Sequence, residues 1–338
     1  MCKKATRKII LFFLLLVATI ICTMTACNSR GLRGDRGELY SSPGQTPPVS
    51  SEQIPARTKT VSHTLGQTDI PLHPERIVVL DAGSTFLLDG LLALGIKPVG
   101  LTRCSNCINS DPFSDIVGEL PSVGTQNQPS LEKILKLKPD LILGYRWQKS
   151  FYSQLSQIAP AVMLDPFDRG HQVKRNFRQL AEILSKSEQV EDILAEYDER
   201  IQKFQQRFGE KLKNKTVSLL SFYEAGFHVY GPEILFIAAV MKDAGIQFIP
   251  AYNALKDDAL FNMSLEVLPD WDADFLFIDL YYEDSIEELE SVFKQPLWSK
   301  LKAVRNDQVY IMTEYPSGGP IGANRFIDEL SEYFSNKL

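Results

Sequence analysis

Short apolar runs alternate with helix-like segments along most of the chain. Runs at 77–80, 98–101 and 141–143 are separated by stretches in which apolar residues recur every three or four positions, the spacing of an amphipathic helix. The same alternation returns later, with apolar runs at 217–220 and 275–280. Strands that alternate with short helices predict an α/β fold with mainly parallel sheets, covered by helices on both faces.

The segment 171–212 has a different pattern. It is rich in Glu, Lys, Gln and Leu, contains no Pro, and keeps apolar residues at helical spacing in two stretches, the longer of which runs from Val190 to Phe208. This pattern predicts a helical crossing that contains one long helix. The chain is therefore expected to form two Rossmann-like lobes, 56–170 and 213–338, joined by that single long helix and with a ligand cleft between them.

One short pattern occurs twice in the same register. Ser130-Leu131-Glu132 is followed by Asp140 and an apolar run, and Ser264-Leu265-Glu266 is followed at the same distance by Asp274 and another apolar run. Ser is a common helix N-cap and Glu suits the first helical turn, so a single copy could be only a favourable helix start. Two copies in register predict two lobes built alike, each with a short helix that exposes one carboxylate.

The N-terminal pattern predicts an exported protein. Basic residues precede an apolar run at 9–22, which is short for a membrane span and ends at Met24-Thr25-Ala26-Cys27. These four residues resemble a bacterial lipobox, in which the Cys is lipid-modified, although Leu is usual where Met24 stands. We expect residues 1–26 to be a lipoprotein signal peptide and Cys27 the lipidation site; a plain signal peptide or an uncleaved anchor is the alternative. Residues 27–55 are expected to be a flexible tether, because they are rich in Gly, Pro, Ser, Gln and Arg.

Charge and motifs exclude some functions. Removing residues 1–26 would take away four positive charges and no negative ones, which lowers the formal net charge from −6 to −10. An acidic chain is a poor partner for nucleic acid, which carries the same sign of charge. The sequence contains no G-x-S-x-G, G-x-G-x-x-G, Walker or H-E-x-x-H motif. We therefore predict a binding protein and no enzyme; an exported hydrolase or a tethered sensor is the alternative from another class.

Arginine and aromatic residues follow the predicted strands in both lobes. Ligands of open α/β sheets bind beyond the carboxyl ends of the strands. Guanidinium groups hold anionic oxygens, and Tyr and Trp add flat apolar area with one polar tip. Such rings also pack at lobe surfaces without binding anything, and Phe222 is expected to alternate inward. The predicted ligand-binding residues are Arg103, Arg146, Trp147, Tyr223, Tyr281, Tyr282 and Tyr315.

The histidines and cysteines do not form a metal-binding pattern. The four His residues are scattered along the chain, so we predict no direct metal site and no cofactor, and expect any iron to arrive already chelated. Cys104 and Cys107 are separated by two residues. In an exported chain a structural disulfide is the first interpretation, and free thiols or a metal or redox site are the others.

Several segments, taken in order, resemble one protein family. They are similar to the helical-backbone (class III) substrate-binding proteins of bacterial ABC importers, which take up ferric siderophores, haem and cobalamin. The resemblance covers nearly all of residues 60–338. The segments that carry it are 74–80, 91–100 and 131–143 in the first lobe and 296–298, 302–304 and 308–310 in the second.

The resemblance implies a specific function. The protein would work as a monomer in the periplasm or on the outer face of the cytoplasmic membrane, held there by its lipid. It would capture a ferric siderophore and deliver it to the permease, with cobalamin or haem as alternative ligands. Hydroxamate and citrate siderophores are favoured because Arg follows the strands. In this family one Glu on each lobe docks into a basic pocket of a permease subunit, and the matching residues here are Glu132 and Glu266.

Overall fold

The structure is a computed structural model, and the statements below refer to the residues that it describes: 57–81, 86–103, 113–166, 172–224, 226–280, 285–312 and 316–338. Three sets of sequence predictions lie outside these ranges. They are the signal peptide and tether with Cys27, the pair Cys104 and Cys107, and the residues Tyr281, Tyr282 and Tyr315. Within the described ranges no helix is both long and apolar enough to cross a membrane.

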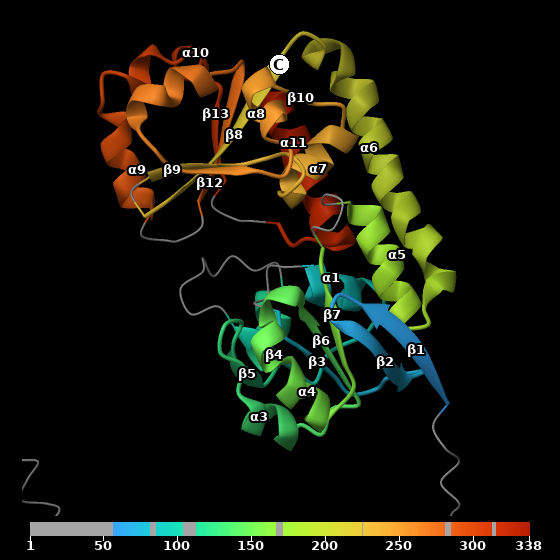
Figure 1. The fold of residues 1–338 in the computed structure, drawn as a ribbon. Helices are drawn as coiled ribbons and strands as arrows, with labels where there is room; N and C mark the ends of the chain where they lie inside the picture. Colours follow the sequence, from blue (N-terminus) through green and yellow to red (C-terminus); the bar gives the residue numbers. More distant parts are fainter. Residues whose placement is uncertain are drawn as a thin grey trace, which may run out of the picture. The chain divides into compact units, whose positions relative to one another are not determined.

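The first lobe is built on a parallel sheet of five strands (Figure 1). The order of the strands is β5-β4-β3-β6-β7, and each neighbouring pair is parallel. An antiparallel hairpin of two further strands, β1 and β2, precedes this sheet in the chain. The strands of the lobe are β1 Thr58–His63, β2 Gly66–Pro71, β3 Ile77–Val79, β4 Gly100–Arg103, β5 Ser122–Thr125, β6 Leu141–Tyr145 and β7 Ala161–Leu164.

Helices cover both faces of this sheet, as the sequence predicts. Along β3, Ile77 and Val79 belong to one buried cluster and Val78 to another. Because side chains alternate between the faces of a strand, a strand covered on both sides is apolar at every position. Residues of α1 and α5 complete the first cluster, and residues of α3 and α4 complete the second. The helices are α1 Phe86–Ala93, α2 Ser114–Glu119, α3 Leu131–Lys136, α4 Tyr152–Ile158 and α5 Val173–Ile183.

One long helix packs against the hydrophobic cores of both lobes. After α5 and a short 3-10 helix at Ser187–Gln189, α6 runs for 23 residues from Val190 to Leu212. Val190 and Leu194 of α6 belong to the core of the first lobe. Five later residues of α6 belong to the core of the second lobe, namely Tyr197, Ile201, Phe204, Phe208 and Leu212. Bending α6 would expose apolar side chains of one core or the other, so the helix resists bending.

The second lobe contains a mixed sheet. Its main order is β11-β9-β8-β12-β13, and β10 pairs with the start of β8. The pairings of β12 with β8 and β13 are parallel, whereas β9 is antiparallel to β8 and β11. The predicted parallel arrangement therefore holds at the centre of this sheet but not at one edge, where β8 and β9 form a tight hairpin. The strands are β8 Thr216–Tyr223, β9 Gly226–Tyr230, β10 Gln247–Phe248, β11 Ala259–Met263, β12 Phe275–Leu280 and β13 Val309–Met312.

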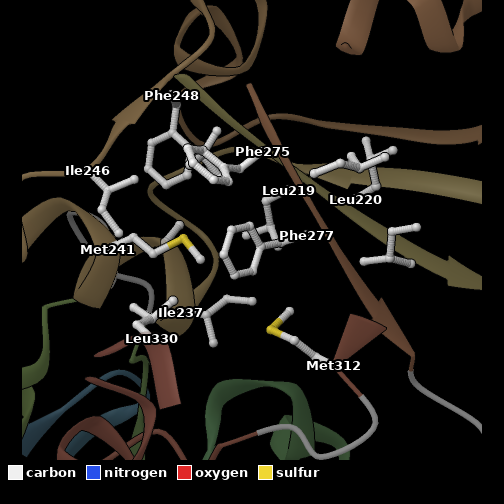
Figure 2. Packing of buried hydrophobic residues seen from close by; sticks show 14 of the residues in the cluster. Leu219, Leu220, Ile237, Met241, Ile246, Phe248, Phe275, Phe277, Met312 and Leu330 are labelled. Carbon is white, nitrogen blue, oxygen red and sulfur yellow. The ribbon is translucent and has the colours of Figure 1, made fainter. Parts of the chain in front are cut away.

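The core of the second lobe lies between this sheet and its helices. Figure 2 shows Phe277 and Leu219 of the sheet close to Met241 and Ile237 of α7. The last helix, α11, adds Phe334, whose ring meets that of Phe204 on α6 edge-on with centroids 5.9 Å apart. The helices are α7 Phe236–Asp243, α8 Pro250–Leu255, η3 Leu265–Trp271, α9 Ser285–Phe293, η4 Trp298–Lys300, α10 Lys302–Arg305 and α11 Pro320–Lys337.

The two copies of the Ser-Leu-Glu repeat begin alike and continue differently. The Ser130 hydroxyl accepts a hydrogen bond from the backbone N–H of Lys133, and the Ser264 hydroxyl accepts one from Glu266. The first copy then forms an α-helix, α3, but the second forms the 3-10 helix η3. The predicted short helix is therefore present in both copies, and in the second copy it is a 3-10 helix that contains Pro269, a residue with no N–H to donate.

The aspartate of each copy holds the beginning of a central strand. Asp140 accepts hydrogen bonds from the backbone N–H groups of Glu75 and Arg76, just before β3, at 2.8 and 2.9 Å. Asp274 accepts one from the backbone N–H of Thr216, the first residue of β8, at 3.1 Å. The repeat therefore contains an architectural residue, the aspartate, and an exposed residue, the glutamate.

A buried carboxylate joins the two lobes near the start of α11. Asp89 of α1 accepts hydrogen bonds from the backbone N–H groups of Ile321 and Gly322, at 3.0 and 2.7 Å, and from the hydroxyl of Ser317. Burial raises the pKa of Asp89 to about 6, and these hydrogen bonds oppose that shift. Gly319 is needed here, because a Cβ on it would lie 2.3 Å from Asp89 Oδ1.

Replacing Asp89 with Ala is expected to lower the free energy of unfolding by about 2–4 kcal/mol, because the buried N–H groups of Ile321 and Gly322 lose their acceptor. Urea unfolding followed by circular dichroism measures the change. Ser317→Ala, which removes one donor and leaves the carboxylate bound to the backbone, should cost about 1 kcal/mol. Asp192→Ala, at an exposed position in the first turn of α6, is the control. A loss below 1 kcal/mol in Asp89→Ala would contradict the assigned role.

Candidate functional site

Two predicted ligand-binding residues lie at the carboxyl end of the parallel sheet of the first lobe. Arg146 and Trp147 follow β6 directly and begin the 3-10 helix η1, Arg146–Phe151. The Nε of Arg146 donates to the carboxylate of Asp165, just past β7, at 2.9 Å, yet the Arg146 side chain stays 60% exposed. The Trp147 residue is 39% exposed. A guanidinium group and an indole ring are thus presented together at the edge where α/β sheets bind ligands.

A buried tyrosine fixes the ring of Trp147. The rings of Tyr145 and Trp147 are stacked, with centroids 4.3 Å apart and planes inclined by 21°. The Tyr145 hydroxyl donates to Asp81 Oδ2 and accepts from the backbone N–H of Leu87, both at 3.2 Å. Because Tyr145 is fully buried and held at its hydroxyl, the indole lies on a rigid support, which lowers the entropy cost of binding on it.

The side chain of Gln148 holds the turn that carries Arg146 and Trp147. Gln148 is 2% exposed. Its Oε1 accepts from the backbone N–H of Tyr145 at 2.7 Å, and its Nε2 donates to the carbonyls of Leu80 and Gln126 at 3.0 and 3.3 Å. One side-chain amide therefore bonds to the backbone at the carboxyl ends of three strands, β3, β5 and β6. Sequence reasoning did not assign a role to Gln148, since a polar residue after a strand gives no sign of being buried.

Arg103 lies at the carboxyl end of a strand, as the sequence predicts. It is the last residue of β4, which extends beyond the apolar run at 98–101. Its Nη2 donates to the backbone carbonyls of Val117 and Leu120 at 2.7 and 2.9 Å. These bonds hold the end of α2, where helix carbonyls need donors. A role for Arg103 in ligand binding stays a prediction.

Tyr223 ends β8 in the second lobe and belongs to an aromatic group. Its ring stacks on that of His228, with centroids 3.7 Å apart and planes inclined by 6°. Its hydroxyl lies 2.7 Å from the hydroxyl of Tyr230. Phe261 of β11, which is 58% exposed, meets the rings of His228 and Tyr230 edge-on. Phe222 is 1% exposed, which confirms that it alternates away from Tyr223 into the core.

A buried polar row lies on the same face as Tyr223. His228, Ser221 and Asp279 are direct neighbours across β9, β8 and β12. The Ser221 hydroxyl donates to Asp279 Oδ2 at 3.3 Å, whereas Asp279 Oδ1 is buried with no hydrogen-bond partner within the described part of the chain. Burial raises the pKa of Asp279 to about 7. A carboxyl in an apolar interior favours the neutral form, because ionising it there is costly.

A pocket of about 540 Å³ lies between the start of α5 and α7. Four basic residues line it, Lys174, Arg175, Arg178 and Lys242, together with Glu233 and Asp243. Arg178 makes two hydrogen bonds of 2.8 Å with Glu191, and Lys174 is paired with Asp198. The pocket is basic, but part of its charge is already neutralised.

The described residues contain no group of three or more His, Cys, Asp or Glu side chains that could hold a metal ion. That the protein binds no metal directly stays a prediction, because parts of the chain at the strand ends are outside the described ranges. The groups that the strand ends do present, a guanidinium and aromatic rings, are suited to an organic anion.

Comparison with known families decides the class of protein. The family model for periplasmic binding proteins matches residues 77–316, which include both sheets and the helical crossing. The chain belongs to the periplasmic binding protein family. Its two lobes and single long helix are those of a substrate-binding protein of an ABC importer, as the sequence resemblance implies. The exposed residues at the strand ends, Arg146 and Trp147, therefore belong to a protein whose role is to bind a ligand.

Individual members of this family are similar over most of the chain. The "Probable siderophore-binding lipoprotein YfiY" of Bacillus subtilis is 31% identical, with 97% of this chain and 98% of that protein covered. The "Achromobactin-binding periplasmic protein" of Dickeya dadantii is 32% identical, with 76% and 86% covered. The crystal structure of Staphylococcus aureus SirA complexed with staphyloferrin B superimposes with a TM-score of 0.69 at 26% identity, covering 82% and 99% of the two chains.

Stability should depend on pH through Asp279. Its pKa is about 7 in the folded protein and about 3.9 in an unfolded chain. The folded state therefore holds the proton more tightly, and the stability from this group is full below pH 4 and is lost as the pH rises through 7. The unfolding free energy of the wild type minus that of Asp279→Asn is expected to fall by about 2–4 kcal/mol between pH 4 and pH 8. Urea unfolding at both pH values tests this, and a constant difference would contradict it.

Proposed function

We propose that this binding protein captures a ferric siderophore of the hydroxamate or citrate type outside the cytoplasm and delivers it to an ABC permease. The neighbouring pair Arg146 and Trp147 carries the proposal. In a ferric chelate of this kind, hydroxamate or carboxylate oxygens that carry negative charge surround the iron, and the rim is organic. A guanidinium group pairs with such oxygens through charge-assisted bonds, and an indole packs against the rim.

The contacts of this pair suit a ligand that brings its own charge. Asp165 holds Arg146 through Nε, which fixes the direction of the guanidinium and leaves most of the side chain exposed. Trp147 rests on the buried ring of Tyr145. Both groups are therefore preorganised, and little conformational entropy is lost when a ligand binds. Tyr223 on the second lobe, and Tyr281, Tyr282 and Tyr315, are proposed to complete the site.

The relatives support a siderophore over other ligands. One similar protein is named as a probable siderophore-binding lipoprotein, one as an achromobactin-binding protein, and the SirA structure contains staphyloferrin B. Cobalamin or haem is the alternative ligand of the same class of importer. We also propose that Cys27 carries a lipid and that residues 27–55 tether the lobes to the membrane surface, in keeping with the lipoprotein named among the relatives.

The exposed glutamates of the repeat are proposed to dock on the permease. Glu132 and Glu266 are both exposed, at the start of α3 and of η3. Each is fixed to a short helix whose first turn is capped by a serine. Two carboxylates at fixed positions on a rigid body can bind two cationic sites at the same time, one on each permease subunit. An exposed pair contributes only about 0.2–1 kcal/mol, but one that loses its water at an interface matters more.

Tryptophan fluorescence is expected to identify the ligand. The chain has three Trp residues, and Trp271 and Trp298 are buried in the second lobe, so a ligand on Trp147 should quench the exposed one. Ferric hydroxamates or ferric citrate should quench the wild type, and Trp147→Phe should remove the signal. Arg146→Gln should weaken binding about 10–100-fold, the loss of one charge-assisted hydrogen bond. Quenching by cobalamin or haemin but by no ferric chelate would overturn the assignment.

The docking proposal predicts separate effects on transport and binding. Glu132→Ala combined with Glu266→Ala should abolish uptake of the iron chelate by cells, because both carboxylates are lost from the interface. Equilibrium dialysis of the purified variant should give a ligand affinity within about twofold of the wild type, since neither residue belongs to the proposed ligand site. Glu199→Ala combined with Glu210→Ala, two exposed residues of α6, is the matched control. Loss of ligand affinity in the docking variant would count against the assignment.

A further inference from the structure

The two repeat segments, which share the sequence Ser-Leu-Glu, differ in the charge around that motif. We name residues 130–138 the N-tip and residues 264–272 the C-tip. The N-tip contains one carboxylate, Glu132, and three lysines. The C-tip contains three carboxylates and no basic residue. Two segments that begin with the same three residues and the same capping serine therefore carry opposite net charge.

The structure shows that Glu132 is already paired with a lysine, which partly neutralises its charge. Its Oε1 lies 2.6 Å from Nζ of Lys136, one helical turn further along α3, and the two side chains are 76% and 72% exposed. Lys133 and Lys138 are exposed as well. The guanidinium of Arg76 adds another positive charge at the end of α3, where it donates to the carbonyls of Leu137 and Lys138 at 3.2 and 3.0 Å.

The C-tip keeps its negative charge. Glu266 has no ion pair within the described part of the chain, and the residue four positions later is the exposed Asp270. Asp272 accepts from the backbone N–H groups of Lys302 and Ala303 and so caps α10. Lys302, whose backbone bonds to Asp272, and Lys215 are both paired with Asp274 at 3.1 Å. Glu266 and Asp270 thus remain available to an outside cation.

Each tip also exposes one aliphatic side chain beside its glutamate. Leu135 of the N-tip is 59% exposed, and Val267 of the C-tip is 38% exposed. Large apolar side chains exposed to this degree are few among the described residues. Leu135 lies three residues after Glu132, on the same side of α3. Each tip therefore offers a partner an apolar contact as well as charge, which suits a protein surface better than a small ion.

We infer that the two tips bind chemically unlike sites on one membrane partner. The C-tip fits a cationic site with an apolar contact. The N-tip fits a site of mixed charge, with a cation for Glu132 and acidic groups for its lysines. The inference rests on the proposed docking of Glu132 and Glu266 and adds that the two ends cannot exchange places. A contact between like charges at an interface costs more free energy than the loss of one ion pair. The difference in charge between the two tips would therefore fix one orientation of the protein on its permease.

Charge reversal on the N-tip tests the inference. Uptake of a radioactive ferric chelate is measured in cells that lack their own copy and express each variant at equal level. Lys133→Glu combined with Lys136→Glu keeps both repeat glutamates but makes the N-tip acidic, and it should reduce uptake at least fivefold. Lys203→Glu on α6 combined with Lys213→Glu directly after that helix makes the same change in net charge at lysines that pair with a glutamate, and it should leave uptake unchanged.

Single glutamate variants give the second arm. Glu266→Gln should reduce uptake at least fivefold more than Glu132→Gln, because Glu132 is partly neutralised by Lys136. Equal losses in the two, together with normal uptake in the variant with an acidic N-tip, would overturn the inference and leave the docking proposal intact. Normal uptake when both glutamates are replaced by Ala would instead remove the docking proposal, and this inference with it. Purified variants should bind the chelate as the wild type does; if the variant with an acidic N-tip does not, Lys133→Gln combined with Lys136→Gln takes its place.

Discussion

The arrangement of the two lobes depends on one buried carboxylate. Asp89 lies on α1 of the first lobe and accepts hydrogen bonds from the start of α11 in the second. The contact is so close that a Cβ on Gly319 would clash with Asp89, and a Cβ on Gly322 would clash with Ser317. Helix α6 joins the lobes through its apolar face, and Asp89 joins them at a second point by polar contacts. Two connections of this kind restrict the relative movement of the lobes to rotation about the line between them.

Local patterns predicted the elements, whereas long-range contacts decided their details. The apolar runs at 77–80 and 141–143 became β3 and β6, and the helical spacing after Val190 became α6. Those predictions succeed because a strand buried on both faces and a long amphipathic helix each produce a recognisable pattern of apolar residues along the chain. The direction of β9 was not predictable in this way, since an apolar run is the same in a parallel and an antiparallel strand. The 3-10 helix at Leu265–Trp271 shows a different limit: the repeat predicts a short helix in both copies but not the type of helix.

The candidate site shows the same division. Arg146 and Trp147 could be predicted, because the residues after a parallel strand lie at the edge that binds ligands. Their supports could not. Asp165 is 19 positions from Arg146, and Gln148 reaches the carbonyls of Leu80 and Gln126 from other strands. Arg103 is another example, since its guanidinium bonds to the end of α2, a contact that its position after an apolar run does not indicate. Side-chain pairing between distant segments is a property of the fold that no local pattern contains.

An acidic protein for which we propose a ligand with negatively charged oxygens must keep its charges apart. The chain carries a formal net charge of −6, which by itself would repel such a ligand. At physiological ionic strength charges more than about 8 Å apart are largely screened, so the ligand responds mainly to the groups at the strand ends, where Arg146 is presented. The excess of carboxylates then acts elsewhere. On the C-tip, Glu266 and Asp270 can attract a cationic partner without weakening the ligand site. Segregation of the two signs of charge is what the proposed capture of an anion and the proposed docking on a basic surface would together require of one small body.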